Sequence, residues 1–386
     1  MSALLRSMPV QRDARIDLLR GIAILVVMLL HFSLTYRLTQ SPLAVWLTPQ
    51  FVRALIINGN YGVTIFFAIS GFLITSNSLR RAGTLAQIDM RKFYVYRFAR
   101  IMPTLLLALL AIILFSCLGL PSFADSVHGK PLPASYFVLA LVSVLTFWHN
   151  VLMQSVGYFN YCLNIYWSLS VEEVFYLALP LAAVLTRRTS MFVALCLALV
   201  VAGPVYRAMH ADNELFFMYG YVACFDAIAL GCLAALLRNR FDLSPLTNRV
   251  ATIVGVITLT ATYFIGIDGH EVFGFSAIAL STSILLVSSP ALPRADWSSS
   301  RVLQPLNWLG RHSYELYLFH IIVLALMRDL VSRDSLGYAI KLPWLALFIA
   351  LSAGVAGVIS RLFSEPANQA LRQYLSTASP MPATQE

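Results

Sequence analysis

The sequence predicts an all-α protein that crosses a membrane several times. Apolar residues make up 59% of its 386 residues and charged residues only 12%, and the mean hydropathy is +0.75. Such a composition is typical of multi-pass membrane proteins and excludes an ordinary soluble domain. The net charge of +9 fits basic loops along one membrane face better than a nucleic-acid-binding surface. We therefore expect the lipid bilayer, and not nucleic acid, around this chain.

Eleven apolar segments are candidates for membrane spans, but one of them is short. The stretch from Tyr136 to Trp148 holds only about 13 residues, a length typical of re-entrant or buried pieces. We therefore predict about ten transmembrane helices, near residues 20–37, 61–79, 101–119, 166–186, 190–207, 217–237, 250–267, 272–290, 313–328 and 343–363.

The distribution of basic residues supports ten spans with both termini in the cytoplasm. With ten crossings, 20 of the 27 Lys and Arg residues fall on the side of the termini. With eleven crossings the two sides would carry almost equal numbers, against the excess of Lys and Arg in cytoplasmic loops. Residues 135–165 are then expected to form a re-entrant segment in the external half of the membrane.

These spans imply one membrane domain with two short flanks. We predict a cytoplasmic N-terminal segment over residues 1–19, a single transmembrane domain over 20–363 and a cytoplasmic tail over 364–386. The first segment has three arginines and no apolar core, so no cleavable signal peptide is visible. The five cysteines contain no CxxC pair and are expected to be packing residues, so we predict no disulfide framework and no metal site.

His31 lies in the middle of the first predicted span. Eleven residues separate it from Arg20, which places it about 16 Å along a helix, near the centre of a hydrocarbon core about 30 Å thick. An ionisable side chain at this depth marks a functional site by default, and a neutral imidazole suits general-base work on a hydroxyl. Arg15 and Asp17 precede Arg20 and complete this group. The alternatives are a histidine satisfied by a neighbouring helix and, for Arg20, an ordinary basic flank.

Two further groups of charged residues accompany His31. Arg97 and Arg100 lie three residues apart on one face of a helix, where they can bind phosphate oxygens of a cytosolic molecule or anchor the helix to lipid headgroups. Glu172 and Glu173 enter the membrane from the outside and point about 100° apart, so at most one of them is expected to face the same cavity as His31. Ser168, one turn before Glu172, could hydrogen-bond it. Structural salt bridges are the alternative for both glutamates.

Weaker candidates lie in later spans. Asp226 and His320 are deep enough to serve a site, but each is equally explained as a polar contact between helices. Ser70 and Gly71 are predicted to be positions of close helix packing.

Taken together, five ordered motifs resemble the acyltransferase 3 family of membrane O-acyltransferases. They are RIDLLRGIAILVVMLLHF with FFAISGFLIT, then RFARIMP, YWSLSVEEVFYLALPL with its Trp167–Ser168 pair, LGRHSYELYLFH, and SRLFSEPANQALR. The resemblance covers nearly the whole chain. The segment FDAIALG fits less well, because the family often carries an arginine just before its acidic residue, where this chain has Cys224 and Phe225.

The resemblance implies a bacterial inner-membrane enzyme that moves an acyl group, commonly acetyl, from cytoplasmic acyl-CoA to a sugar hydroxyl of a surface polysaccharide or other glycan. It implies acyl-CoA as a co-substrate, no permanently bound cofactor, and a stand-alone form without an appended external domain; the oligomeric state is open. In this scheme Arg20, Arg97 and Arg100 hold the donor phosphates. His31 is the base, and Glu172 or Glu173 orients it.

Several alternatives stay open at this point. His31 either takes a proton during direct transfer or carries the acyl group itself. The acceptor is either a glycan or a small molecule such as a macrolide or an oligosaccharide signal. Other functions consistent with the residues are a proton-coupled secondary transporter, against which the lack of an internal repeat argues, and a non-catalytic scaffold.

Overall fold

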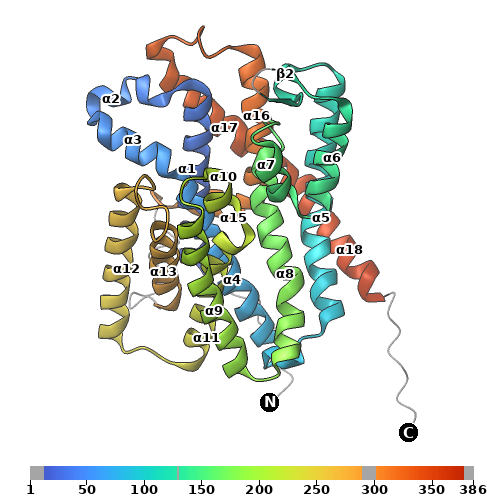
Figure 1. Cartoon of the computed structure of the whole chain (residues 1–386), viewed down its shortest axis with the longest axis vertical. Coiled ribbons are helices and arrows are strands. Elements are labelled where there is room, and N and C mark those ends of the chain that lie inside the picture. Colours follow the sequence, from blue (N-terminus) through green and yellow to red (C-terminus); the bar gives the residue numbers. More distant parts are fainter. Residues whose placement is uncertain (1–12, 128–129, 289–300, 378–386) are drawn as a thin grey trace.

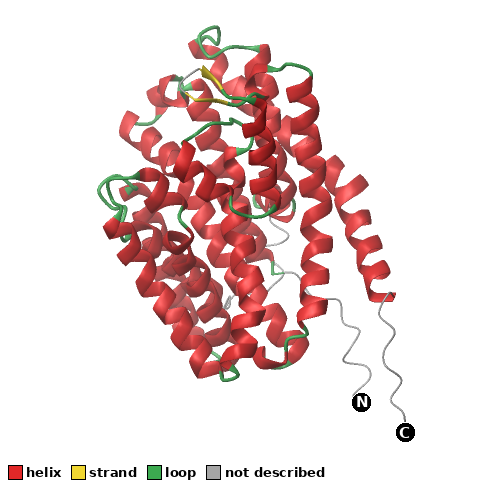
Figure 2. Ribbon diagram, turned by 45° about the vertical axis from the view of Figure 1, so that its right-hand side comes forward, coloured by secondary structure: helices red, strands yellow, loops and turns green. Residues whose placement is uncertain are grey.

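The protein is a bundle of long helices that run alongside one another between two ends (Figure 1). The computed structural model describes residues 13–127, 130–288 and 301–377. Within these ranges the only strands are β1 (Ser126–Val127) and β2 (Lys130–Pro131), which pair antiparallel and stand out in Figure 2 against the helices. The predicted all-α class is confirmed.

Ten helices in the described ranges correspond one to one to the predicted spans. Eight helical segments there are long and apolar enough to cross a membrane. The other two are α13, which has 14 residues, and α16, which carries charged residues near both ends. The ten helices are α1 (Ala14–Tyr36), α4 (Tyr61–Ala82), α5 (Met90–Cys117), α8 (Trp167–Thr186), α9 (Thr189–Met209), α11 (Tyr221–Arg240), α12 (Pro245–Ile265), α13 (Gly274–Val287), α16 (Ser313–Leu330) and α17 (Lys341–Ile359).

Shorter helices fill the two ends of the bundle and flank it. They are α2 (Leu43–Trp46), α3 (Pro49–Ile57), α6 (Ala134–Leu145), α7 (His149–Val156), α10 (Glu214–Tyr219), α15 (Gln304–Arg311) and α18 (Glu365–Thr377). In Figure 1, α2 and α3 lie at the upper end of α1, whereas α18 descends beside α5.

The segment predicted to be re-entrant contains two short helices and no helix of membrane-spanning length. Helix α6 has 12 residues, so it is about 18 Å long and cannot cross a core about 30 Å thick. The chain turns between α6 and α7 at Phe147, whose φ is 63° and whose carbonyl accepts a hydrogen bond from the Tyr221 hydroxyl. Both helices lie in the upper half of Figure 1, beside α8, as a fold-back would place them.

Both predicted flanks are more helical than we expected. Asp13 caps the N-terminus of α1 by accepting a hydrogen bond from the amide of Arg15, so the helix begins at Ala14, within the predicted N-terminal segment. At the other end, α17 continues through a π-helical turn at Ser360–Ser364 into α18. Residues 365–377 of the predicted C-terminal tail therefore form a helix packed against α5. Residues 1–12 and 378–386 of the two predicted flanks lie outside the described ranges.

Glycines allow the central helices to approach closely. A Cβ added at Gly71 of α4 would lie 2.0 Å from the carbonyl oxygen of Ile228, and one at Gly231 of α11 would lie 2.0 Å from that of Ala68. A Cβ at Gly21 of α1 would likewise lie 1.9 Å from the carbonyl oxygen of Leu306, next to α15. Such small-residue contacts are typical of membrane helices, and they confirm the prediction for Gly71.

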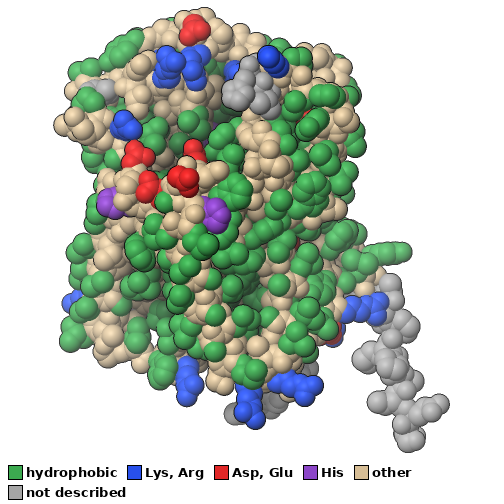
Figure 3. Space-filling model, viewed as in Figure 1, with side chains coloured by type: hydrophobic (Ala, Val, Ile, Leu, Met, Phe, Trp, Pro, Cys, Tyr) green, Lys and Arg blue, Asp and Glu red, His purple; other side chains and the backbone are tan. Residues whose placement is uncertain are grey.

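The surface matches a chain embedded in lipid. On the face shown in Figure 3, apolar side chains are spread over the middle of the molecule, Lys and Arg lie near both its upper and its lower end, and Asp and Glu gather in its upper half. Helix α5 presents Leu106, Leu110 and Leu114 outward, all of them exposed. An apolar belt between polar ends is what a bilayer requires.

Candidate active site

A cavity of about 630 Å³ occupies one half of the bundle. Its walls come from α1, α4, α5, α8, α16 and α18, so it joins the first, middle and last parts of the chain. The volume is in the range of small-molecule sites. Phe66, Phe67, Leu73 and Ile74 make one side of it apolar. Its outer rim is formed by exposed residues at the end of α4 and the start of α5, among them Arg81 and Lys92.

The cavity is rich in positive charge. Six basic side chains line it, whereas only two carboxylates do. One of these, Asp89, caps α5 at the rim; the backbone amide of Lys92 donates to it and lowers its pKa. In the described part of the chain, no hydrogen bond or ion pair is recorded for the side chains of Arg20 and Arg100. The basic side chains are Arg20, Arg81, Lys92, Arg97, Arg100 and Arg372.

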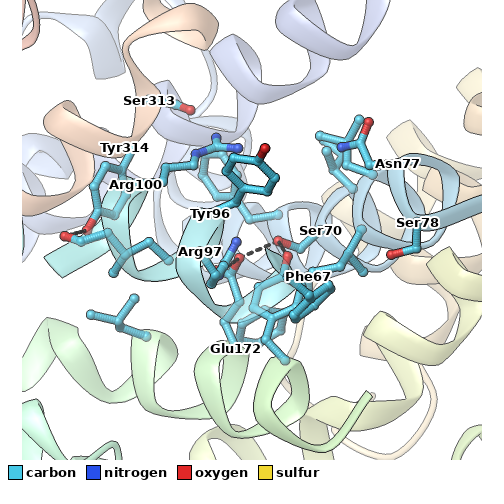
Figure 4. Close-up of a pocket in the computed structure, with 18 of the residues that line it drawn as sticks. Phe67, Ser70, Asn77, Ser78, Tyr96, Arg97, Arg100, Glu172, Ser313 and Tyr314 are labelled. Atoms are coloured by element: carbon cyan, nitrogen blue, oxygen red, sulfur yellow. Dashed lines mark hydrogen bonds and ion pairs between the residues drawn. The ribbon is translucent and has the colours of Figure 1, made fainter. Parts of the chain in front are cut away.

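Arg97, in contrast to Arg20 and Arg100, binds both glutamates of α8. Its guanidinium lies 3.0 Å from Oε1 of Glu172 and 3.1 Å, through Nε, from Oε1 of Glu173. It also stacks over the Tyr176 ring, with its central carbon 3.5 Å from the ring centre. Ser70 donates to Glu172 and accepts from the hydroxyl of Tyr176 at 2.6 Å. Figure 4 shows Ser70, Arg97 and Glu172 converging at the cavity wall.

The two glutamates point different ways, as their spacing predicted. Glu172 lines the cavity, whereas Glu173 does not and is only 4% exposed. The structure does not, however, bring either one into contact with His31. Both carboxylates are held by Arg97, because a guanidinium offers charge compensation that a neutral imidazole lacks. The predicted pairing of Glu172 or Glu173 with His31 is therefore wrong for this arrangement.

His31 instead contacts a second histidine. Its Nδ1 lies 3.1 Å from Nε2 of His320 on α16, and the two ring centres are 5.1 Å apart. His320 is completely buried, whereas His31 is half-buried. His31 is not among the residues that line the cavity.

Tyr317 connects the cavity to this histidine pair. It lines the cavity, and its ring centre lies 6.0 Å from that of His320. Its hydroxyl lies 2.5 Å from Oγ of Ser168 and donates to the carbonyl of Ile165 at 2.8 Å. The prediction that Ser168 would bond Glu172 is wrong: the hydroxyl of Ser168 is used by Tyr317 on the neighbouring helix.

Asp226 lies in a different environment from the cavity. It forms an ion pair with Arg207 of α9 at 2.7 Å, with both side chains almost completely buried, and it accepts from Ser276 at 2.6 Å. Arg207 also donates to the carbonyls of Val272 and Ala223. These contacts match the interpretation of Asp226 as a polar link between helices. Cys224 and Phe225 precede Asp226 where the family often has an arginine, and in this chain Arg207 of α9 provides the guanidinium that pairs with Asp226.

The remaining predicted residues support the helices around the site. Arg15 binds Asp13 at 2.9 Å and the carbonyl of Ser288, and Asp17 lies 3.9 Å from Arg311. Trp167 packs against Phe67 and Tyr219. None of Arg15, Asp17 and Trp167 lines the large cavity. All five cysteines are free, and the described residues contain no group of metal-binding side chains.

Sequence reasoning missed four residues of this region. Tyr176 is one turn after Glu172, so their shared helix face was a usable indication. Ser70 was assigned to packing alone, and Tyr317 and Arg372 were not singled out. Arg372 ends the motif SRLFSEPANQALR, but the motif alone did not place it in the site, because the packing of α18 on α5 brings it to the cavity.

Comparison with known proteins identifies the family. A family model described as an acyltransferase domain matches residues 13–361. The chain belongs to the acyltransferase 3 family. The motif-based resemblance is thereby confirmed over most of the chain, and with it the assignment to multi-pass membrane proteins.

Curated relatives of this acyltransferase 3 protein are O-acetyltransferases. The O-acetyltransferase OatA of Staphylococcus aureus is 23% identical over 327 residues, covering 79% of this chain and 49% of the relative. The peptidoglycan O-acetyltransferase OatA of Listeria monocytogenes is 23% identical over 329 residues, covering 81% and 49%. The putative peptidoglycan O-acetyltransferase YrhL of Bacillus subtilis is 27% identical over 296 residues, covering 70% and 45%. The chain thus spans about half the length of these relatives. No solved structure matches it.

Proposed function

We propose that the protein is a membrane O-acyltransferase that takes an acyl group, most simply acetyl, from acyl-CoA and passes it to a sugar hydroxyl of a glycan. The observation that carries this proposal is the basic cavity, whose wall includes Tyr317 beside the His31–His320 pair. The names of the curated relatives support the acetyl group and the glycan acceptor.

The cavity suits the donor in two respects. Coenzyme A carries phosphate groups, and Arg20 and Arg100 offer charged donors that no recorded ion pair uses; arginine binds phosphate oxygens with two parallel hydrogen bonds. The thioester lies at the end of an uncharged arm, which fits the apolar wall around Phe66 and Leu73. The rim contains Arg81 at the end of α4 and Lys92 at the start of α5, and the excess of Lys and Arg around these helix ends supports a cytoplasmic position for the rim.

The chemistry needs one base and no bound cofactor. A lone pair of His31 takes the proton of the acceptor hydroxyl while that oxygen attacks the acyl carbonyl carbon. The new C–O ester bond forms, the C–S bond breaks, and the departing thiolate receives the proton from His31 as free coenzyme A. On this proposal the thioester passes Tyr317, which lines the cavity with its ring centre 6.0 Å from that of His320, to reach His31.

The decisive experiment measures covalent transfer. In one assay, protein in lipid nanodiscs is given cell-surface glycans and acetyl-CoA that is labelled in the acetyl group. In a second assay, mass spectrometry compares the glycans of cells that contain the chain with those of cells that lack it. We expect an acetyl-sized mass shift that disappears in H31A, while H31A still inserts and stays monodisperse. Normal acylation by H31A would overturn the proposed role of His31.

Other readouts separate the alternatives. Label found only on a small molecule would replace the glycan acceptor with that molecule. Proton-coupled uptake of a solute without any labelled product would indicate a transporter instead.

A further inference from the structure

The His31–His320 contact defines which nitrogen of His31 is free to react. Neither ring has a carboxylate partner among the recorded hydrogen bonds and ion pairs of the described residues, since Glu172 and Glu173 are both held by Arg97. An isolated imidazolium at this depth would carry a large desolvation cost. We therefore consider both rings neutral, with one N–H and one lone pair each.

The surroundings of His320 set its tautomer. Its Nδ1 lies 2.9 Å from the carbonyl oxygen of Leu316 and 2.9 Å from that of Tyr317. Carbonyl oxygens only accept hydrogen bonds, so this nitrogen carries the hydrogen. In the neutral ring, Nε2 of His320 is then left with the lone pair, and it faces His31.

The same reasoning then determines the tautomer of His31. Because Nε2 of His320 is an acceptor, Nδ1 of His31 must be the donor across the 3.1 Å contact. The lone pair of His31 therefore sits on Nε2, on the opposite side of the ring from His320.

We propose that His320 is a positioning residue that orients His31 and holds it in the tautomer whose Nε2 is the reactive nitrogen. This inference rests on the proposed acyl transfer by His31. His320 plays the part that a carboxylate plays beside many catalytic histidines, as the group that orients the base. It does so as a neutral acceptor, anchored by two carbonyls of its own helix α16.

The pair also explains how His31 can become charged inside the bundle. When Nε2 takes a proton from the acceptor hydroxyl, the Nδ1–H···Nε2 bond to His320 becomes charge-assisted and stronger. The interaction is thus stronger in the transition state than in the ground state, which is the condition for lowering the barrier. Removing His320 should therefore lower kcat and leave donor binding unchanged.

Two substitutions of His320 distinguish positioning from packing. H320L fills the space but has no acceptor, whereas the side-chain oxygen of H320Q can accept from Nδ1 of His31. We expect kcat to fall about 10²-fold in H320L and to stay within about tenfold of the wild type in H320Q, with unchanged KM for the donor. The matched control is H312Q, because His312 has the same contact with the carbonyl four residues before it and lies outside the cavity. It should retain wild-type kcat.

A spectroscopic measurement tests the inference without using activity. Solid-state NMR of protein labelled with ¹⁵N-histidine, with His31 assigned from its loss in H31A, should show a protonated Nδ1 and an unprotonated Nε2. The opposite tautomer would overturn the inference. So would wild-type kcat in H320L, or a loss in H320Q equal to that in H320L when both proteins are folded. If no acyl transfer is found in the wild type, the proposed function fails while the NMR result still decides the tautomer.

Discussion

Arg100 and Arg20 are the residues on which we propose that donor recognition depends, because they line the cavity and neither forms an ion pair in the described part of the chain. Arg97 shows the contrast. It lies on the same helix as Arg100, yet it is neutralised by two glutamates and stacked on Tyr176. Arg97 therefore shapes the wall of the cavity, whereas Arg20 and Arg100 keep their hydrogen-bond donors for a ligand.

We predict that R100Q weakens the donor interaction specifically. A hydrogen bond to a charged group contributes about 1.5–3 kcal/mol, so KM for acyl-CoA should rise about ten- to hundredfold with little change in kcat. The matched control is R80Q, since Arg80 is exposed, donates to Asn77 and does not line the cavity. Steady-state kinetics with varied acyl-CoA measure both variants; an unchanged KM in R100Q would contradict a phosphate contact at Arg100.

The sequence identified several residues of the site but not the partners of these residues. His31, Arg97 and Glu172 were found because ionisable groups in apolar helices are rare and expensive. Their partners were not found, because partners depend on which helices lie side by side. The choice between Arg97 and His31 as the partner of the glutamates is decided by the packing of α5 against α8, and no spacing along one helix contains that information.

At the scale of helices, α9 and α11 are joined by the buried Arg207–Asp226 pair. The guanidinium also binds two carbonyls and Ser276, so its hydrogen bonds are well satisfied. A buried pair of this kind contributes little by its presence, but removing one member leaves an unpaired charge.

We predict that D226N destabilises the bundle by about 3–5 kcal/mol because it leaves Arg207 buried without a counter-charge. Replacing both residues, as R207M with D226L, should recover most of the lost stability. Thermal unfolding in detergent, followed by tryptophan fluorescence, measures the single and double variants. If D226N unfolds at the wild-type temperature, the pair does not link α9 and α11 as described.

The last helix shows the limit of sequence reasoning at this scale. The ten helices of the predicted spans were predictable from apolar length together with the distribution of Lys and Arg. Helix α18 is polar on most of its surface, and the sequence alone suggested a tail. The π-helical turn at Ser360–Ser364 and the contact with α5 convert it into a wall of the cavity, and Arg372 follows from that contact.

At the scale of the whole molecule, the question is which membrane face the cavity opens to. The rim of the cavity lies at the start of α5, beside Lys92. The same helix is 28 residues long and ends at Cys117, about 40 Å from its start, where that exposed thiol lies toward the other face. The other four cysteines are buried, so Cys117 is the native thiol best placed to report that face. If the ten-span topology is right, the donor enters from the cytoplasm and Cys117 faces outward.

We predict opposite labelling of these two positions by a membrane-impermeant maleimide. In intact cells Cys117 should react, and the cysteine of K92C in a C117S background should not; in inside-out vesicles the pattern should reverse. Acyl-CoA should slow labelling of K92C about tenfold when present at ten times its Kd, because the occupied cavity shields the thiol. Labelling of Cys117 should be unaffected by acyl-CoA and serves as the control. If the cysteine of K92C reacted from outside intact cells, the basic cavity would open away from the cytoplasm. The proposed entry of acyl-CoA from the cytoplasm would then be wrong.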